Sequence, residues 1–309
     1  MQLVHPNRLF STTLTQLAAA AVAVTLLAAV PCTAAQPDWS KVSAALGKSG
    51  TEMPGDVYRV GLPRTDLHVT LDGVELKPGF ALGSWLAFRP EGNETMVMGD
   101  LVLTETEIAP VMTKLADGGI NITALHNHLL RAQPATFYMH VFGQGDATKL
   151  AAALHDGLVL SKTPLGNTGG GNAPASQTVE LDTAMIDSTL GAKGRANGGV
   201  YQIGIARAET IKDDGMDVPV AMGSAESINF QPTGNGRAAI TGDFVLTAAE
   251  VNPVLRALRA NGIEVTALHN HMLDDQPRLF FMHFWANDDV QKLAKGLRAA
   301  LDKINITRS

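Results

Sequence analysis

The pattern of apolar and polar residues predicts the same series of elements twice along the chain. In the first series, residues 96–103 alternate as a strand does. Thr104 and Glu107 then have the spacing of a capping box, in which each side chain bonds a free backbone amide at a helix start. Apolar residues at helical spacing follow over 108–115. The next predicted elements are a strand over 120–130, a strand over 136–142 and a helix capped by Asp146. In the second series, the corresponding last helix is expected to be capped by Asn287 or Asp288.

This duplication is literal. Residues 99–142 align with 242–285 at a constant offset of 143 residues, and 23 of these 44 positions are identical. A repeat of this length indicates a duplicated domain. Between the copies, Gly, Pro, Ser and Asn replace any apolar periodicity, which is typical of a linker. We expect a first repeat domain over 38–160, a linker over 161–178 and a second repeat domain over 179–309.

The order strand, helix, strand, strand, helix favours the α+β class. It predicts that each repeat forms an antiparallel sheet with helices on one face. We expect a ferredoxin-like βαββα core in each copy, preceded by additional N-terminal strands. One of these is expected to turn back as a hairpin at Asp72-Gly73, because that dipeptide favours a tight hairpin turn.

The first 35 residues have the features of a secretory signal peptide. Arg8 is their only charged residue, 17–30 is apolar, and Thr33-Ala34-Ala35 is a small-residue cleavage site. The apolar part is short for a membrane span. We therefore expect a periplasmic or secreted protein without a membrane span. Cys32 is the only cysteine, and lipid anchoring through it is the alternative, although Pro31 is not the small residue expected before a lipidated cysteine.

Charge limits the classes of partner. The chain has 24 basic and 30 acidic residues, a net charge of −6, and no basic block. Binding to nucleic acid or to an anionic membrane depends largely on clustered positive charge. We therefore exclude nucleic acid as a partner and expect a small molecule or a component of the cell envelope.

The strongest candidate chemistry is a pair of histidine trios, and these contain six of the nine histidines. The trios are His126, His128 and His140 in the first repeat and His269, His271 and His283 in the second. Residues i and i+2 of a strand point to one face, and a paired strand can bring the third ring beside them. Burial among apolar neighbours favours neutral imidazole, which is the form that binds metal. The pattern predicts a transition-metal site, with zinc first and copper or iron next.

Polar neighbours of the trios are candidates for a supporting role. Histidine ligands usually donate their second ring N–H to an acceptor. Asp100, Asp243 or the side-chain amides of Asn127 and Asn270 could supply this acceptor. The sequence does not choose between two independent sites and two trios that face each other across a pseudo-two-fold axis.

The repeated strings TALHNHLLRAQPATFYMH and TALHNHMLDDQPRLFFMHFWAND resemble the LppY/LpqO-like family of bacterial exported proteins. That family is defined by a domain of unknown function that often occurs as a tandem pair. The resemblance covers most of the chain after residue 35. It implies export and a duplicated domain, and it carries over no reaction.

Three functions remain open at this stage. The first is an exported metal-binding protein, either a metal carrier or a metal-dependent hydrolase. The second is a metal-free hydrolase or phosphoesterase that uses one histidine from each repeat. The third is a non-enzymatic module that binds a cell-envelope ligand. The sequence does not decide whether the protein is an enzyme.

Overall fold

The computed structural model describes residues 37–166 and 178–307. The expected signal peptide, Cys32 and most of the expected linker lie outside these residues. Within the described ranges, no helix is both long enough and apolar enough to cross a membrane.

Each repeat builds one six-stranded antiparallel sheet, as expected for the α+β class. The first sheet has the order β1 (Thr51–Met53), β2 (Val57–Pro63), β5 (Gly83–Glu91), β6 (Glu94–Thr104), β8 (Thr136–Gly145) and β7 (Asn121–His126). The second has the order β15 (Glu264–His269), β17 (Leu279–Asp289), β14 (Arg237–Thr247), β13 (Ala225–Gly234), β10 (Val200–Ala206) and β9 (Arg195–Asn197). The expected βαββα core is β6-α3-β7-β8-α4, and the preceding strand β5 pairs with its β6 edge.

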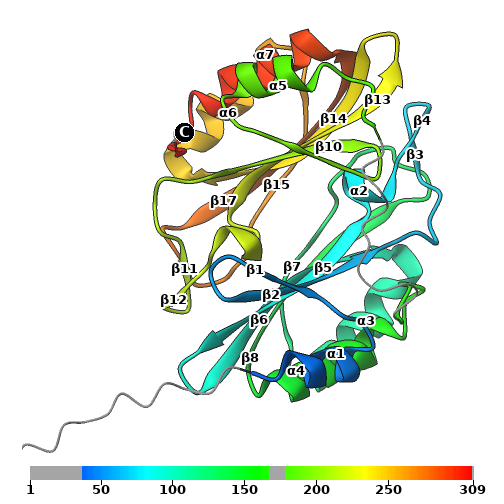
Figure 1. Ribbon diagram of the computed structural model, residues 1–309, viewed down its shortest axis with the longest axis vertical. Coiled ribbons are helices and arrows are strands. Elements are labelled where there is room, and N and C mark those ends of the chain that lie inside the picture. The colour runs from blue at the N-terminus through cyan, green and yellow to red at the C-terminus, as the bar shows by residue number, and fades with distance from the viewer. Residues whose placement is uncertain (1–36, 167–177, 308–309) are drawn as a thin grey trace, which may run out of the picture. The chain divides into compact units, whose positions relative to one another are not determined.

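The longer helices of each repeat gather on one face of its own sheet (Figure 1). They are α1 (Trp39–Leu46), α3 (Glu105–Asp117) and α4 (Ala147–Leu158) in the first repeat, and α5 (Thr183–Leu190), α6 (Ala248–Ala260) and α7 (Val290–Leu301) in the second. A short helix α2 (Pro78–Ala81) and a 3-10 turn η1 (Val220–Met222) precede β5 and β13. The remaining short strands are β3 (Thr70–Leu71), β4 (Val74–Glu75), β11 (Lys212–Asp213), β12 (Met216–Asp217) and β16 (Asp275–Gln276).

Helix starts follow the local sequence closely. Both predicted capping boxes form, at Thr104 with Glu107 and at Thr247 with Glu250. Asp146 accepts a hydrogen bond from the Lys149 amide at the start of α4. These contacts satisfy amides that have no partner inside the helix.

Two local predictions were wrong. The cap of α7 was expected at Asn287 or Asp288, but it is Asp289, because β17 stays paired with β14 up to that residue. The strand predicted over 120–130 ends at His126, so His128 lies beyond it. The start of α7 and the end of β7 are both set by strand pairing, which the local sequence pattern does not encode.

The sheet faces opposite the long helices contribute jointly to two apolar clusters. In the larger one, Met98 and Phe142 of the first repeat pack with Val245 and Phe281 of the second. In the other, the Phe80 and Trp285 rings meet edge to face at 6.1 Å. The two repeats therefore share a core, and one aromatic ring of each cluster stacks on a histidine, Phe281 on His271 and Tyr138 on His128.

Candidate metal centre

The six repeated histidines come together in one cluster between the repeats. Three close ring pairs cross from one repeat to the other. They are His126 with His269 at 3.4 Å between ring centroids, His128 with His283 at 3.7 Å and His140 with His271 at 3.6 Å. When each residue is replaced by its counterpart 143 positions away in the other repeat, the first pair is unchanged and the other two pairs are interchanged. The trios therefore face each other across a pseudo-two-fold axis, which is one of the two arrangements left open by the sequence.

The edge strands β7 and β15 hold this arrangement. Thr123 donates a hydrogen bond to the backbone carbonyl of His271, and Thr266 donates the equivalent bond to that of His128. The contacts are reciprocal, as in an isologous interface between two subunits. Each repeat therefore positions a histidine of the other.

The asparagines within the two His-Asn-His segments also join the repeats. The Asn270 side-chain amide donates to the Thr123 carbonyl at 3.0 Å, and that of Asn127 donates to the Thr266 carbonyl at 3.4 Å. The acceptors for His126 and His269 are the backbone carbonyls of these asparagines, at 3.3 and 3.0 Å from Nδ1. The side-chain amides thus secure the strand ends, while the main chain contacts the rings.

The ring nitrogens fall into two groups. Nδ1 of His126, His269 and His283 faces a backbone carbonyl, which for His283 is that of Gly242 at 2.9 Å. A neutral imidazole that donates through Nδ1 has its lone pair on Nε2. Nε2 is buried without a hydrogen-bond partner in all six histidines. Buried polar atoms almost always have a partner, so six such atoms in one cluster point to a missing electron-pair acceptor.

Two aspartates lie against the cluster, opposite histidines in the sheet register. Asp100 pairs with His140 across β6 and β8, and Asp243 pairs with His283 across β14 and β17. Asp100 lies 3.8 Å from His128 Nε2 and 3.9 Å from His140 Nε2. Asp243 lies 3.4 Å from His271 Nε2 and 3.8 Å from His283 Nδ1. Oδ1 of each aspartate is buried without a hydrogen-bond partner.

Burial controls the protonation of these groups. It lowers the pKa of all six histidines, to about 3 for His126 and about 4 for His269. It raises the pKa of Asp100 to about 8, against the opposing effect of the Arg59 charge. Burial also raises the pKa of Asp243 well above its usual value, and the nearby Asp100 charge adds to this. The cluster therefore holds neutral imidazoles beside carboxyl groups whose ionised form needs a cation.

Four of the histidines satisfy a simple geometric condition for one ion. One ring nitrogen each from His126, His269, His271 and His283 can be chosen so that all lie within 4.8 Å of one another. Histidine nitrogens bind zinc at about 2.0–2.1 Å and suit copper, iron and nickel as well. The donor set therefore fits a transition metal, and it draws on both repeats.

Two arginines that match across the repeats are not part of this site. Arg64 and Arg207 are 143 positions apart in the sequence, and such matched arginines could bind an anion or lie in solvent, but both are buried. Arg64 pairs with Glu107 at 2.9 Å and Arg207 pairs with Glu250 at 2.9 Å. Each arginine joins a capped helix start to its sheet, which is a structural role that residue spacing did not indicate.

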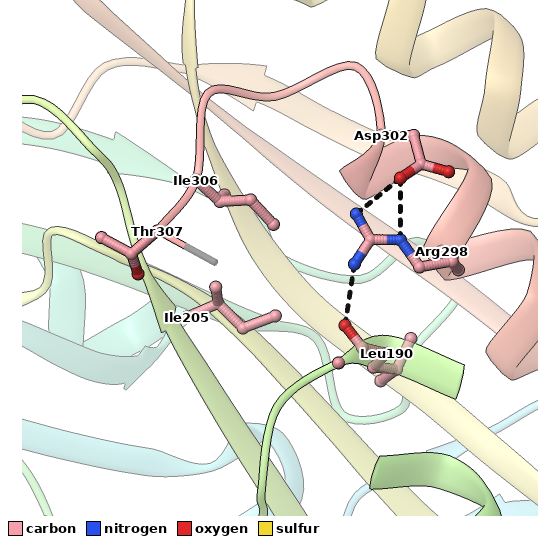
Figure 2. A pocket seen from close by; sticks show the side chains of 7 residues that line it. Leu190, Ile205, Arg298, Asp302, Ile306 and Thr307 are labelled. Atoms are coloured by element: carbon pink, nitrogen blue, oxygen red, sulfur yellow. Dashed lines mark hydrogen bonds and ion pairs between the residues drawn. The ribbon is translucent and has the colours of Figure 1, made fainter. Parts of the chain in front are cut away.

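A surface pocket in the second repeat is a weaker candidate for a functional site than the histidine cluster. It encloses about 270 Å³ and is lined by Ile205, Ile306 and Arg298, among others. Figure 2 shows the Arg298 guanidinium between the Leu190 carbonyl and the Asp302 carboxylate. All three of its nitrogens have partners there. The pocket therefore presents no unsatisfied polar group of the kind found in the histidine cluster.

Comparisons with known proteins agree with the duplication. A family model described as "Domain of Unknown Function (DUF1259)" matches residues 40–159 and again residues 184–303. The chain belongs to this family. Both matches contain one complete histidine trio and its aspartate, so each copy of the domain brings half of the cluster.

No curated protein matches the chain. Among solved structures, it is similar to a trimeric bacterial microcompartment shell protein, PduB, at 11% identity. That alignment covers 85% of this chain and 97% of the shell protein, with a TM-score of 0.23. A likeness at this level carries no argument about function or assembly.

Proposed function

We propose that this protein binds a transition metal at the histidine cluster between its two repeats. One observation carries the proposal: the buried Nε2 atoms of all six repeated histidines have no hydrogen-bond partner. Leaving a buried polar atom unpaired costs about 1–3 kcal/mol. A bound cation would accept these lone pairs and remove the cost. Histidines that were purely structural would be expected to have hydrogen-bond partners at both ring nitrogens.

The finer parts of the proposal rest on the sequence. The signal-like segment over 1–35 supports a function outside the cytoplasm, in the periplasm or as a secreted protein. The resemblance to the LppY/LpqO-like exported proteins supports the same location. Zinc is the first metal to test, followed by copper and iron, because imidazole ligands suit all three.

Metal carriage fits the cluster better than metal-dependent hydrolysis. His140, His271 and His283 are buried, whereas a hydrolytic ion needs an open position for water and substrate. His126, His128 and His269 are the less buried histidines, so exchange of the metal would take place on their side. A metal-dependent hydrolase acting on a small molecule or a cell-envelope component is the second form of the proposal.

The test is the metal content of protein purified without a polyhistidine tag. We expect a bound transition metal in the wild type and its loss in a His126→Ala/His269→Ala variant. The matched control is His68→Ala, because the His68 side chain is 84% exposed and lies outside the cluster. Circular dichroism would establish that all three proteins are folded. The proposal fails if folded wild-type protein binds none of zinc, copper, iron or nickel when these are supplied.

A further inference from the structure

We propose that the cluster is a two-ion centre, in which each ion is bound by three histidines and one aspartate of a single repeat. The first set is His126, His128, His140 and Asp100. The second set is His269, His271, His283 and Asp243. This inference rests on the proposed metal binding and adds the number of ions and two carboxylate ligands.

The number of unpaired atoms is the first argument. Six Nε2 atoms and the Oδ1 atoms of Asp100 and Asp243 are buried without a partner, which makes eight candidate ligand atoms. A tetrahedral zinc site takes four protein ligands. One ion bound by four histidines would leave two imidazoles and both carboxylates unpaired in the protein interior. Two ions with four ligands each use all eight.

The position of the two aspartates is the second argument. Asp243 Oδ2 lies 3.4 Å from His271 Nε2, and Asp100 Oδ2 lies 3.8 Å from His128 Nε2. Neither contact is a hydrogen bond, because both Nε2 atoms are buried without a hydrogen-bond partner. A cation between the carboxylate and the imidazole would accept lone pairs from both groups. The aspartates are therefore close enough to these rings to bind the same ion.

The ring spacing within each repeat is the third argument. His126 is 5.1 Å from both His128 and His140 between ring centroids. His269 is 5.0 Å from His271 and 4.8 Å from His283. Rings that share a tetrahedral zinc ion have centroids roughly 5 Å apart, given metal–nitrogen bonds of about 2 Å. His126 and His269 therefore each have the spacing of a shared ion to the other two rings of their trio, whereas His271 and His283 are 6.4 Å apart and would have to move closer to share one ion. The shorter contacts between the trios are ring stacking.

The two halves are not equivalent in charge. Arg59 of β2 lies over the Trp85 ring at 4.0 Å, and Trp85 is opposite Asp100 in the sheet register. The residue equivalent to Arg59 in the second repeat is the neutral Gln202. Both reach across the interface in the same way, since Arg59 donates to the Ala221 carbonyl and Gln202 to that of Gly79. The Arg59 charge repels a cation beside Asp100, so the first-repeat ion is bound more weakly.

The experiment is a titration of metal-free full-length protein with Zn²⁺, read by calorimetry and by metal content after gel filtration. We expect two equivalents in the wild type. We expect about one in His128→Ala/His140→Ala and about one in His271→Ala/His283→Ala. Asp100→Asn and Asp243→Asn are milder variants that should each weaken one step and spare the other. A Co²⁺ titration would report on each site through its visible spectrum.

The Arg59→Gln variant tests the inequality of the two steps. It places in the first repeat the side chain that the second already has, so the interface hydrogen bond can be kept. We expect the weaker step to tighten by about tenfold or more, because a positive charge in the protein interior repels a divalent cation. If the Zn²⁺ affinities of both binding steps stay the same in this variant, the assignment of the weaker ion to the first repeat is wrong.

The outcomes separate this inference from the proposed function. One equivalent in the wild type, lost entirely when either repeat is altered, would overturn the two-ion centre and leave a single shared ion. No bound metal in the wild type would overturn both.

Discussion

Thr123 of the first repeat donates its hydroxyl hydrogen bond to the backbone carbonyl of His271 in the second. Thr266 and His128 repeat this contact in the opposite direction. Both bonds lie at the junction of the edge strands, beside the histidine rings. The interface between the repeats and the geometry of the cluster are therefore held by the same atoms.

Replacing Thr123 with valine should weaken this junction. The change keeps the shape of the side chain but leaves the His271 carbonyl without its donor, which should lower the free energy of unfolding by about 1–3 kcal/mol. Urea denaturation measures this difference. Thr123→Ser retains the hydroxyl and should remain close to the wild type. Equal losses in the two variants would show that the hydroxyl contributes nothing.

Replacing Gly242 with alanine should distort the histidine cluster, because the added Cβ has no room. A Cβ at this position would lie 2.1 Å from the Ser227 carbonyl oxygen and 2.6 Å from Cζ of Phe284. The same residue provides the carbonyl that faces His283 Nδ1. We expect a loss of stability of about 1–3 kcal/mol or more, together with weaker metal retention.

The control for that change is Gly204→Ala, in another strand of the same sheet. A Cβ at Gly204 would meet no atom within 4 Å, so both stability and metal content should stay near the wild type. Thermal denaturation and metal analysis of the two variants give the comparison. The steric account of Gly242 is wrong if the two glycine variants behave alike.

The buried pair of Arg64 and Glu107 should make stability depend on acid pH. Burial alone would raise the pKa of Glu107, but hydrogen bonds from Arg64 and from the Thr104 and Lys162 amides outweigh it and lower the pKa. A carboxyl whose pKa is lower in the folded state stabilises the fold above its unfolded pKa of about 4.5. That contribution is lost as the pH falls through the folded value.

Glu107→Gln should therefore destabilise the protein by about 3–5 kcal/mol near pH 7, the usual effect of removing one partner of a buried ion pair. The difference from the wild type should shrink below about pH 4. Urea midpoints at pH 7 and pH 3.5 measure it. Glu105→Gln, at an exposed position of the same helix turn, should have little effect at either pH. A difference that does not change with pH would contradict this assignment.

Replacing Tyr138 with phenylalanine should separate fold stability from metal binding. The Tyr138 hydroxyl donates to the Ala81 carbonyl, and its ring stacks on His128 at 3.3 Å between centroids. The second repeat already has Phe281 at this position, stacked on His271 at 3.4 Å. We expect a loss of about 1 kcal/mol with unchanged metal content. Loss of metal in this variant would assign the hydroxyl a part in the site.

Much of the fold followed from local patterns. The spacing of Thr104 with Glu107, and of Thr247 with Glu250, predicted two helix starts that the structure confirms. The Asp72-Gly73 turn was confirmed in the same way, with both residues at positive φ. Such features depend on atoms a few residues apart, so the sequence carries them directly.

Strand ends and buried charges were harder to predict. His128 lies outside the strand expected to contain it because pairing with β8 stops at His126. Arg64 was not recognised as buried because its partner Glu107 is 43 residues away. Partners at such separations are brought together by the sheet, and no local period reports them.

By itself, the sequence determined the duplication, the α+β class of each repeat and the identity of the repeated histidines, because identical spacing in two copies needs no knowledge of the fold. Only the tertiary structure decided that the trios interleave. The stacking of His126 on His269, of His128 on His283 and of His140 on His271 arises from packing between the repeats. That packing joins residues more than 100 positions apart through shared burial and reciprocal hydrogen bonds.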